Sequence, residues 1–413
     1  MSARGLESLW VWIDDPAFGP LQRIGTLAQG DRGVIRFSYE RSWLESGGAF
    51  ALDPSLRLAD GEHFAKDGNF GVFMDSCPDR WGQILMRRRE ALAARDAGRK
   101  SRELGSWDFL QGVQDITRMG ALRFSPPDSK RFLADDALAA PPLARLAELQ
   151  ALATELSRTD IDDLPELRQW LAALLAPGSS LGGARPKANL VDEKQGLWIA
   201  KFPAANDTYD VALWEMLLQE LALDAGIEVS EARLWKTSAR PHTFLTRRFD
   251  RHQGGRRFFC SAMTLLEKSD GEAASYLELA EFLASQGDPE RLEADLAQLF
   301  RRVVFNVAVG NRDDHLRNHG FLRVLAGWTL APAYDLNPAF DKAEHVLALD
   351  EHVSRPDLDL VLETGAFYRL SKIQAKGILD EVVGAIGPWE KRAKALGMPR
   401  SEVARGESLF RLR

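Results

Sequence analysis

The chain has 413 residues, more than one hydrophobic core usually serves, so we expect two or three folded units. Its hydrophobic content of 45% and charged content of 27% are typical of a soluble globular protein, and no apolar run is long enough to span a bilayer. A formal net charge of -7 argues against a protein that coats nucleic acid directly, although residues 87–102 are rich in Arg and Lys.

Two cysteines occur, Cys77 and Cys260, and they lie far apart in the sequence, so we expect no disulfide framework. A reducing compartment fits this usage of cysteine. The first residues lack the apolar core of a secretory signal peptide. Together these features predict a cytoplasmic protein that does not associate with membranes.

The first 125 residues are predicted to be mainly β-structure with some helix. Short runs of β-type residues cover 9–13 and 34–39, and apolar residues at helical spacing follow in 79–95. Residues 119–124 are expected to form the last strand of this unit. Paired prolines between 125 and 142 then interrupt regular structure and mark a boundary.

The second part of the chain begins with a predicted helix over 143–175, which Pro177 and Gly178 end. Strands and one amphipathic helix are then expected at 188–191, 197–202, 209–225 and 243–246. From residue 260 the chain is predicted to be mostly helical. A β-rich half followed by a helical half predicts an α+β fold with the two lobes of a protein kinase.

The run from Gly310 to Asn318, followed by Asp335, carries the clearest chemical signal. Asp313 precedes Asn318 by five residues, and Asp335 comes further along the chain. In a phosphoryl-transfer enzyme, one Asp receives the proton of the attacking hydroxyl, while an Asn and a second Asp hold the Mg²⁺ on ATP. The stretch therefore indicates a kinase.

The elements around this run are expected to bring its acceptors together. A buried helix is predicted over 292–309, so the run is a loop that leaves the end of this helix. A hairpin with strands over 320–324 and 328–331 would then return the chain. Asn318 and Asp335 would flank one metal ion, and their oxygen atoms suit Mg²⁺.

Two further features lie upstream of this run. Adjacent glycines in the run 179–187 would let the backbone approach phosphate groups closely. Lys201, on the strand that follows, could reach the α- and β-phosphates of ATP. Glu215 on the next helix could pair with Lys201, and Glu220 is the competing partner.

Two other interpretations of the Asp-Asp-His run are open. It could be a polar loop that caps the next element, or Asp313, Asp314 and His315 could bind the metal of a hydrolase. A hydrolase would not explain the upstream glycine loop or the strand lysine. The order of all three features favours the kinase.

Over nearly its whole length the chain resembles the HipA family of bacterial serine/threonine kinases, the toxins of type II toxin–antitoxin modules. The segments that carry the resemblance are 50–56, 119–124, 180–187, 201–203, 248–251, 311–318 and 334–335. The resemblance implies a HipA-type N-terminal domain over 1–125, a kinase N-lobe over 126–259 and a helical C-lobe over 260–413.

The resemblance also implies roles for individual residues. Asp313 would be the catalytic base, and Asn318 with Asp335 would bind Mg²⁺. Backbone groups at 247–249 would contact adenine. The full set implied for ATP is Gly182, Gly183, Ala184, Arg185, Pro186, Lys187, Lys201, Arg247, Arg248, Phe249, His315, Leu316, Arg317, Asn318, Tyr334 and Asp335.

Family members autophosphorylate a serine of the glycine loop, and Ser180 takes that place here, with Ser179 as the second choice. The added negative charge would favour ejection of the loop and switch the kinase off. Two positions depart from the family pattern. Asp314 stands where Gly is common, so a second carboxylate would raise the pKa of the base or join the metal shell, and Arg247 stands where Glu is common.

The function implied is an ATP- and Mg²⁺-dependent kinase that phosphorylates a cellular protein, with aminoacyl-tRNA synthetases as the family's example of a target. Such a toxin is linked to persistence and is restrained by a HipB-like helix-turn-helix antitoxin, which also binds operator DNA. Two alternatives remain: a small-molecule or lipid kinase, since Asp-x-His-x-x-Asn also resembles phosphoinositide kinases, and a pseudokinase that serves as a corepressor.

Overall fold

The computed structural model describes residues 6–30, 33–66, 68–134, 140–157, 185–236 and 241–410. The chain forms two compact units. Unit 1 comprises Met1–Asn206 and Asp250–Cys260, and unit 2 comprises Asp207–Phe249 and Ser261–Arg413. The chain therefore passes from unit 2 into unit 1 after Phe249 and returns at Ser261.

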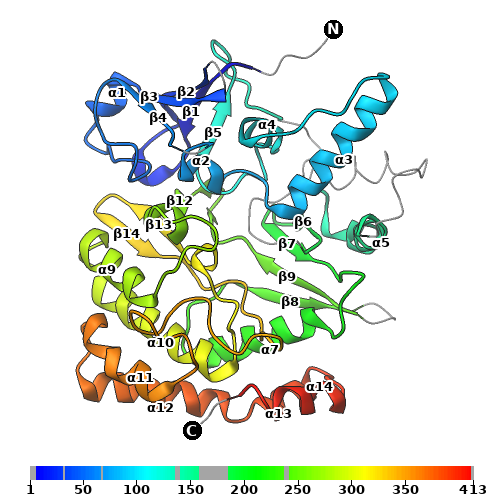
Figure 1. The fold of residues 1–413 in the computed structure, drawn as a ribbon, viewed down its shortest axis with the longest axis vertical. Helices are drawn as coiled ribbons and strands as arrows, with labels where there is room; N and C mark the ends of the chain where they lie inside the picture. The colour runs from blue at the N-terminus through cyan, green and yellow to red at the C-terminus, as the bar shows by residue number, and fades with distance from the viewer. Residues whose placement is uncertain are drawn as a thin grey trace. The chain divides into compact units, whose positions relative to one another are not determined.

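Unit 1 contains a five-stranded antiparallel sheet in the order β4-β3-β2-β1-β5 (Figure 1). Helices α2, α3 and α4 lie between β4 and β5 in the sequence. The elements of this part are β1 (Ser8–Ile13), β2 (Gln22–Gln29), β3 (Ile35–Tyr39), α1 (Arg41–Leu44), β4 (Glu62–Phe64), α2 (Gly71–Asp75), α3 (Arg80–Asp96), α4 (Ser106–Gly112) and β5 (Leu122–Ser125).

The expected strands β1, β3 and β5 and the helix α3 are present, whereas β2 was missed. The reason is a register shift between Val11 and Trp12 of β1, opposite Gly25 and Arg23 of β2. The neighbouring residues Ile24 and Gly25 are both buried there, so β2 lacks the alternation of apolar and polar residues that reveals a strand.

Aromatic packing fills the core beneath this sheet. The ring of Phe37 lies 4.8 Å from Tyr39 and 5.5 Å from Phe73, and Phe73 lies 5.9 Å from Phe124, measured between centroids. A Cβ atom at Gly25 would come within 2.3 Å of the Phe37 ring. Glycine is therefore required at this position so that the ring can lie against the backbone of β2.

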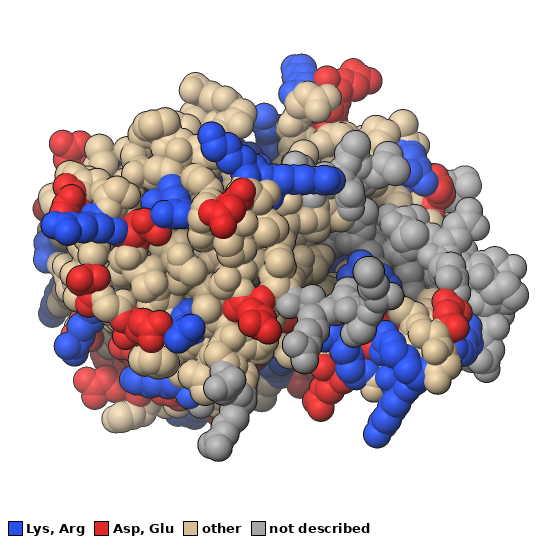
Figure 2. All heavy atoms as spheres, turned by 90° about the horizontal axis from the view of Figure 1, so that it is seen from above, with Lys and Arg blue, Asp and Glu red and all other residues tan. Residues whose placement is uncertain are grey.

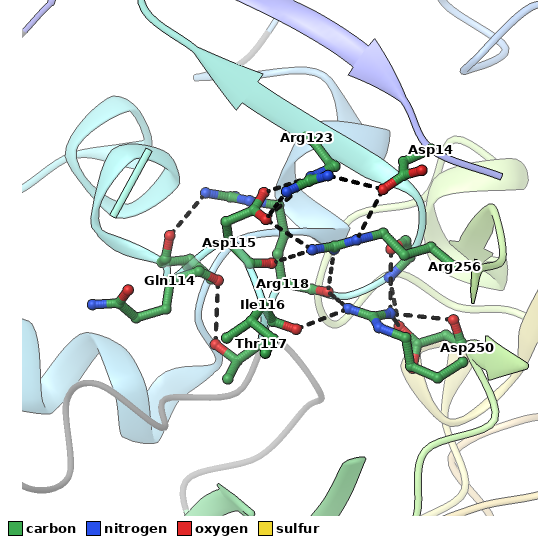
Figure 3. A network of polar contacts seen from close by, with 12 residues as sticks. Asp14, Gln114, Asp115, Ile116, Thr117, Arg118, Arg123, Asp250 and Arg256 are labelled. Carbon is green, nitrogen blue, oxygen red and sulfur yellow. Dashed lines mark hydrogen bonds and ion pairs between the residues drawn. The ribbon is translucent and has the colours of Figure 1, made fainter. Parts of the chain in front are cut away.

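A network of buried charges attaches the segment Asp250–Cys260 to the rest of unit 1 (Figure 3). The carboxylate of Asp115 accepts hydrogen bonds from Arg256 at 3.0 Å and from Arg123 at 2.5 Å. The carboxylate of Asp250 accepts a hydrogen bond from the backbone N–H of Gly120 at 2.8 Å, and Gly120 has a φ of +76°. Because buried charges are tolerated only when they are paired, this network fixes where the segment lies.

Arg118 completes the network from the interior of unit 1. Its guanidinium is fully buried and donates to the carbonyl oxygens of Ser76 at 3.1 Å and Leu110 at 2.8 Å. Burial lowers the pKa of this arginine to about 10, with Cys77 and Asp115 acting in the opposite direction. The side chain thus attaches the segment that precedes β5 to the end of α2 and to α4.

The remaining elements of unit 1 are η1 (Pro16–Phe18), η3 (Leu143–Arg145), α5 (Leu146–Leu156), β6 (Lys187–Val191), β7 (Leu197–Lys201), β10 (Arg251–His252) and β11 (Gly255–Arg256). β6 and β7 pair as an antiparallel hairpin, as expected from the sequence. The expected helix over 143–175 is present as η3 and α5 up to Leu156, and the part from 158 lies outside the described residues.

Unit 2 is mostly helical, with two short hairpins (Figure 1). β12 (Phe259–Ser261) leads into it from unit 1. Its elements are α7 (Val211–Asp224), β8 (Ala232–Trp235), β9 (Thr243–Arg247), α8 (Ala262–Leu265), α9 (Tyr276–Gln286), α10 (Leu292–Val309), η4 (Leu316–Asn318), β13 (Gly320–Val324), β14 (Gly327–Leu330), α11 (Leu358–Glu363), η5 (Thr364–Tyr368), α12 (Lys372–Ile386), α13 (Trp389–Ala395) and α14 (Arg400–Gly406).

The central helix of unit 2 is α10, whose predicted bounds are confirmed. All residues from 302 to 309 are buried, because α9 and α12 both pack against this helix. Arg302 donates to the carbonyl oxygen of Ala331 at 2.7 Å, and Asp295 accepts from the backbone N–H of Leu330 at 2.9 Å. The helix thereby holds the strand β14 through two buried polar side chains.

The C-terminal helices pack against α7. Trp214 of α7 donates its indole N–H to Glu402 of α14 at 2.8 Å, and Arg392 of α13 pairs with Glu220 at 3.3 Å. A Cβ atom at Gly406 would lie 2.7 Å from the Trp214 ring. No helix in the described part of the chain is long and apolar enough to cross a membrane.

We predict that the Asp115 network stabilises unit 1 in a pH-dependent manner. Burial alone would raise the pKa of Asp115, but the charges of Arg256 and Arg123 outweigh it and hold the pKa below the ordinary value of 3.8. A depressed pKa contributes stability that is fully present above 3.8 and is lost as the pH falls through the folded value.

The variant Asp115→Asn should therefore lose about 3 kcal/mol of unfolding free energy at neutral pH, measured by urea titration. The difference from the wild type should shrink as the pH falls below 3.8. A difference that stays constant over this range would contradict the assignment.

Candidate active site

The predicted catalytic loop leaves the C-terminal end of α10 at Gly310, which has a φ of +70°. Its side chains alternate between solvent and the interior. Asp313 is exposed over 59% of its side chain, while Asp314, Leu316 and Asn318 are buried. The loop therefore presents Asp313 outward while its neighbours are held inside unit 2.

The predicted hairpin after this loop is confirmed as β13 and β14. At its open end the backbone N–H of Ala331 donates to the carbonyl oxygen of Gly320 at 2.9 Å. Beyond that point the hydroxyl of Tyr334 donates to the carbonyl oxygen of Arg317 at 2.8 Å. The hairpin thus returns the chain to the loop, and the neighbours of Asn318 and Asp335 are in direct contact.

Asp335 has a left-handed backbone conformation, with a φ of +59°. Non-glycine residues seldom adopt this conformation, and strained residues cluster at functional sites. The side-chain amide of Asn337 donates to Oδ1 of Asp335 at 3.1 Å, which orients the carboxylate.

The donor set of this region fits Mg²⁺. Asn318 offers an amide oxygen and Asp335 offers carboxylate oxygens, and Mg²⁺ binds proteins through one or two such groups while it keeps several waters. Among the described residues no group of three or more His, Cys, Asp and Glu side chains could hold a metal ion.

The hydrolase interpretation required Asp313 and Asp314 to act on one metal ion. Instead, Asp313 contacts Lys342 at the surface, whereas Asp314 accepts hydrogen bonds inside unit 2 from Tyr276 and His319. The two carboxylates therefore point to different surroundings. The expectation that Asp314 joins the metal shell is not supported by these contacts.

Lys342 is a residue of this region that the sequence analysis missed. Its ammonium group forms an ion pair with the carboxylate of Asp313. The segment that carries it is attached to the loop, because Arg312 donates to the carbonyl oxygen of Lys342 at 2.6 Å and Val346 donates to that of Arg312 at 3.0 Å. A lysine seven residues after Asp335 has no motif that would identify it.

Two aromatic residues from the predicted ATP set lie together. The rings of Phe249 and Tyr334 stack at 5.5 Å with an interplanar angle of 24°. Both belong to unit 2, although they are far apart in the sequence. Arg248 beside them is buried.

The backbone N–H of Arg247 donates to the carbonyl oxygen of Glu231 at 2.8 Å. A backbone hydrogen bond between Arg247 and adenine would therefore have to be accepted by the carbonyl oxygen of Arg247. Arg317, also in the predicted set, pairs with Asp270 at 3.0 Å, and the side chain of His315 is half-buried.

The predicted residues in unit 1 include two lysines of the β6–β7 hairpin. Lys187 is buried, and its ammonium group lies 2.9 Å from the carboxylate of Asp79, which also caps the start of α3. This ion pair gives the Lys187 side chain a structural partner, so its contact with ATP stays a prediction. Lys201 ends β7 with a half-buried side chain.

The structure describes only part of the predicted phosphate-binding loop. Arg185 and Pro186 lie just before β6, and Ser179, Ser180 and Gly182–Ala184 lie outside the described residues. Of the two candidate partners for Lys201, Glu215 is buried in α7, and Glu220 pairs with Arg392. The Lys201–Glu215 pair stays a prediction.

Comparison with known proteins agrees with this architecture. Residues 11–125 match the HipA N-terminal domain, and residues 179–389 match the HipA-like C-terminal domain. The HipA chain in a structure titled as the HipA, HipB and operator DNA complex of Shewanella oneidensis MR-1 superposes with a TM-score of 0.69 at 16% identity, covering 97% of this chain and 94% of that one.

A relative in Sinorhizobium fredii, named "Putative kinase Y4mE", is 25% identical over 342 residues, which cover 76% of this chain and 74% of that protein. The class defined by these matches is the two-lobed, protein-kinase-like α+β fold of the HipA type. The chain belongs to the HipA family.

We predict that substitutions of Asp335 change stability and activity independently, because the backbone at this residue is strained. Asp335→Gly and Asp335→Ala both remove the carboxylate, so both should lose Mg²⁺-dependent activity. Only glycine relieves the left-handed conformation. The glycine variant should therefore be more stable than the alanine variant by about 1 kcal/mol in urea unfolding, and equal stabilities would contradict the strain.

Proposed function

We propose that this protein is an ATP- and Mg²⁺-dependent serine/threonine protein kinase and the toxin of a toxin–antitoxin module. The observation that carries the proposal is the exposed carboxylate of Asp313 on a loop whose neighbouring residues are buried. Asn318 lies on the same loop, and Asp335 follows the open end of the adjoining hairpin.

In this mechanism Asp313 accepts the proton of the serine or threonine hydroxyl that attacks the γ-phosphate. Asn318 and Asp335 hold Mg²⁺, which supplies charge neutralisation for the phosphate oxygens when it is bound. Lys201 binds the α- and β-phosphates, and the stacked Phe249 and Tyr334 flank the nucleotide.

Lys342 bears on the same step because its ammonium group contacts the carboxylate of Asp313. The acceptor hydroxyl needs this carboxylate, so Lys342 must give up part of the contact when the acceptor enters. The pair is partly exposed, with side-chain exposures of 38% for Lys342 and 59% for Asp313, so its loss has a small energetic cost.

We further propose that a HipB-like helix-turn-helix antitoxin restrains the kinase and provides most of the contact with operator DNA. Support comes from the Shewanella HipA, whose structure contains HipB and operator DNA. The basic stretch 87–102, which covers the second half of α3 and the residues after it, is partly neutralised, since Arg99 pairs with Glu90 at 2.6 Å and Arg102 pairs with Asp108 at 2.7 Å. Figure 2 shows positive and negative side chains interspersed on the face it presents.

The central prediction is that Asp313→Asn removes phosphotransfer. Loss of a general base lowers the rate by at least about 100-fold, measured as transfer of radiolabel from ATP to protein in a lysate. Asp380→Asn is the matched control, because Asp380 is an exposed acid on α12 that pairs with Lys376. This control should leave the rate unchanged.

The radiolabel assay and a growth assay together separate the alternative functions. Label that appears in a lipid or metabolite extract instead of protein would favour a small-molecule or lipid kinase. Growth inhibition that survives both Asp313→Ala and Asp335→Ala would favour a pseudokinase that acts as a corepressor. Label in protein, lost in both variants, supports the proposal.

Phosphopeptide mass spectrometry would identify the target. Cells that express the wild type should contain a phosphorylated site that is absent with Asp313→Ala, and an aminoacyl-tRNA synthetase is the target class we expect. Phosphorylation of Ser180 in purified wild-type protein, absent in Asp313→Ala, would establish autophosphorylation. If no site differs between the two cultures, the proposal of a protein kinase fails.

A further inference from the structure

We propose that Asp314 is a positioning residue that sets the places of Asp313 and Asn318 by binding three buried donors with one carboxylate oxygen. Oδ2 of Asp314 accepts from the hydroxyl of Tyr276 at 2.7 Å, from Nδ2 of Asn306 at 2.8 Å and from Nε2 of His319 at 2.7 Å. This inference rests on the proposed kinase function.

The three donors come from three different elements of unit 2. Tyr276 begins α9, Asn306 lies in the last turn of α10, and His319 follows η4 at the end of the catalytic loop. The oxygen of one side chain therefore connects the loop to both helices. Each of the four residues in this cluster, which we call the Asp314 cluster, is less than 4% exposed.

Further contacts make the Asp314 cluster rigid. Asn306 also accepts a hydrogen bond from the side-chain amide of Asn311 at 3.0 Å, so both ends of its amide are engaged. The rings of Tyr276 and His319 meet edge to face, with centroids 5.8 Å apart and an interplanar angle of 86°. His319 can donate only if Nε2 carries a proton, so the contact fixes the orientation of its ring.

The chemistry of the site agrees with an ionised carboxylate. Burial alone would raise the pKa of Asp314, but the charge of His319 and the hydrogen bonds from His319 and Tyr276 outweigh burial and lower it. Burial and the neighbouring carboxylate also raise the pKa of Tyr276 well above its ordinary value, so its hydroxyl stays a donor. An ionised acceptor surrounded by donors is the strong form of a buried hydrogen-bond network.

The cluster acts on the two functional residues through the backbone. Asp313 directly precedes Asp314, and Asn318 directly precedes His319. Because consecutive Cα atoms are about 3.8 Å apart across a planar peptide, anchoring Asp314 and His319 restricts where Asp313 and Asn318 can lie. The base and the metal ligand are thus placed by one shared interaction.

The test is Asp314→Asn, which keeps the size of the side chain but replaces one acceptor oxygen by a donor. Asp53→Asn is the matched control, because Asp53 is a buried Asp of unit 1, outside the proposed site, that accepts from the backbone N–H groups of Val72 and Ser55, both at 2.9 Å. Both variants should lose stability in thermal unfolding. Only Asp314→Asn should lose function while it is still folded.

We expect kcat of Asp314→Asn to fall by about 100-fold, the effect of misplacing a catalytic group by roughly 1 Å. KM for ATP at saturating Mg²⁺ should change less than kcat, because the proposed nucleotide contacts of Lys201, Phe249 and Tyr334 lie outside this loop. A second readout does not depend on turnover: Mn²⁺ binding in the presence of a non-hydrolysable ATP analogue, followed by electron paramagnetic resonance. Asp314→Asn should weaken Mn²⁺ binding roughly 10-fold, whereas Asp53→Asn should not.

A conservative variant tests the role of the donor. His319→Gln keeps an N–H group that can reach the carboxylate and should retain more of kcat than His319→Leu, which has none. Equal losses in the two variants would mean that the ring, and not the hydrogen bond, matters at this position, and would overturn the positioning role as stated.

The remaining outcomes are distinct. If Asp314→Asn unfolds at a lower temperature but matches the wild type in kcat and in Mn²⁺ binding, Asp314 is structural only and the inference fails. If the wild type itself binds neither the nucleotide analogue nor Mn²⁺, the proposed kinase function fails, and the positioning role fails with it.

Discussion

A carboxylate that is removed from water must be surrounded by donors, and this constraint at Asp314 organises the catalytic loop. Its oxygen takes hydrogen bonds from α9, α10 and the residue that ends the loop. Donors from all three elements meet this one charge, which attaches the loop to both helices. The loop is thereby held in a defined conformation. In this conformation the carboxylate of Asp313 faces solvent, whereas that of Asp314 is buried.

The helix α10 extends the same principle to the adjoining hairpin. Arg302 and Asp295, both buried, bind backbone groups at the end of β14, while Asn306 supplies a donor to Asp314. One helix thus positions the loop that carries Asn318 and the strand that leads to Asp335. The strain at Asp335 is tolerated because hydrogen bonds hold the chain on either side: the Tyr334 hydroxyl donates to Arg317 before it, and the backbone N–H of Ala339 donates to Gly310 after it.

Unit 1 uses buried charge for a different purpose. The segment Asp250–Cys260 follows Phe249, a residue of the proposed nucleotide site. It is held by Asp115, which accepts from Arg256 of the segment, and by the backbone N–H of Gly120, which donates to Asp250. The Arg-Phe-Asp-Arg run that carried part of the family resemblance therefore combines two roles. Phe249 stacks with Tyr334 in unit 2, whereas Asp250 anchors the chain in unit 1.

The sequence by itself determined the helix α10, the hairpin that follows it, the strands β6 and β7 and the family, because local periodicity and motif spacing encode them. It did not reveal β2, whose bulge breaks the alternation, or Lys342, which no motif marks. Only the tertiary structure decided that Asp314 faces inward, and that Lys187 pairs with Asp79 across more than a hundred residues. The direction of a polar side chain depends on donors that are distant in sequence, and spacing along the chain carries no record of them.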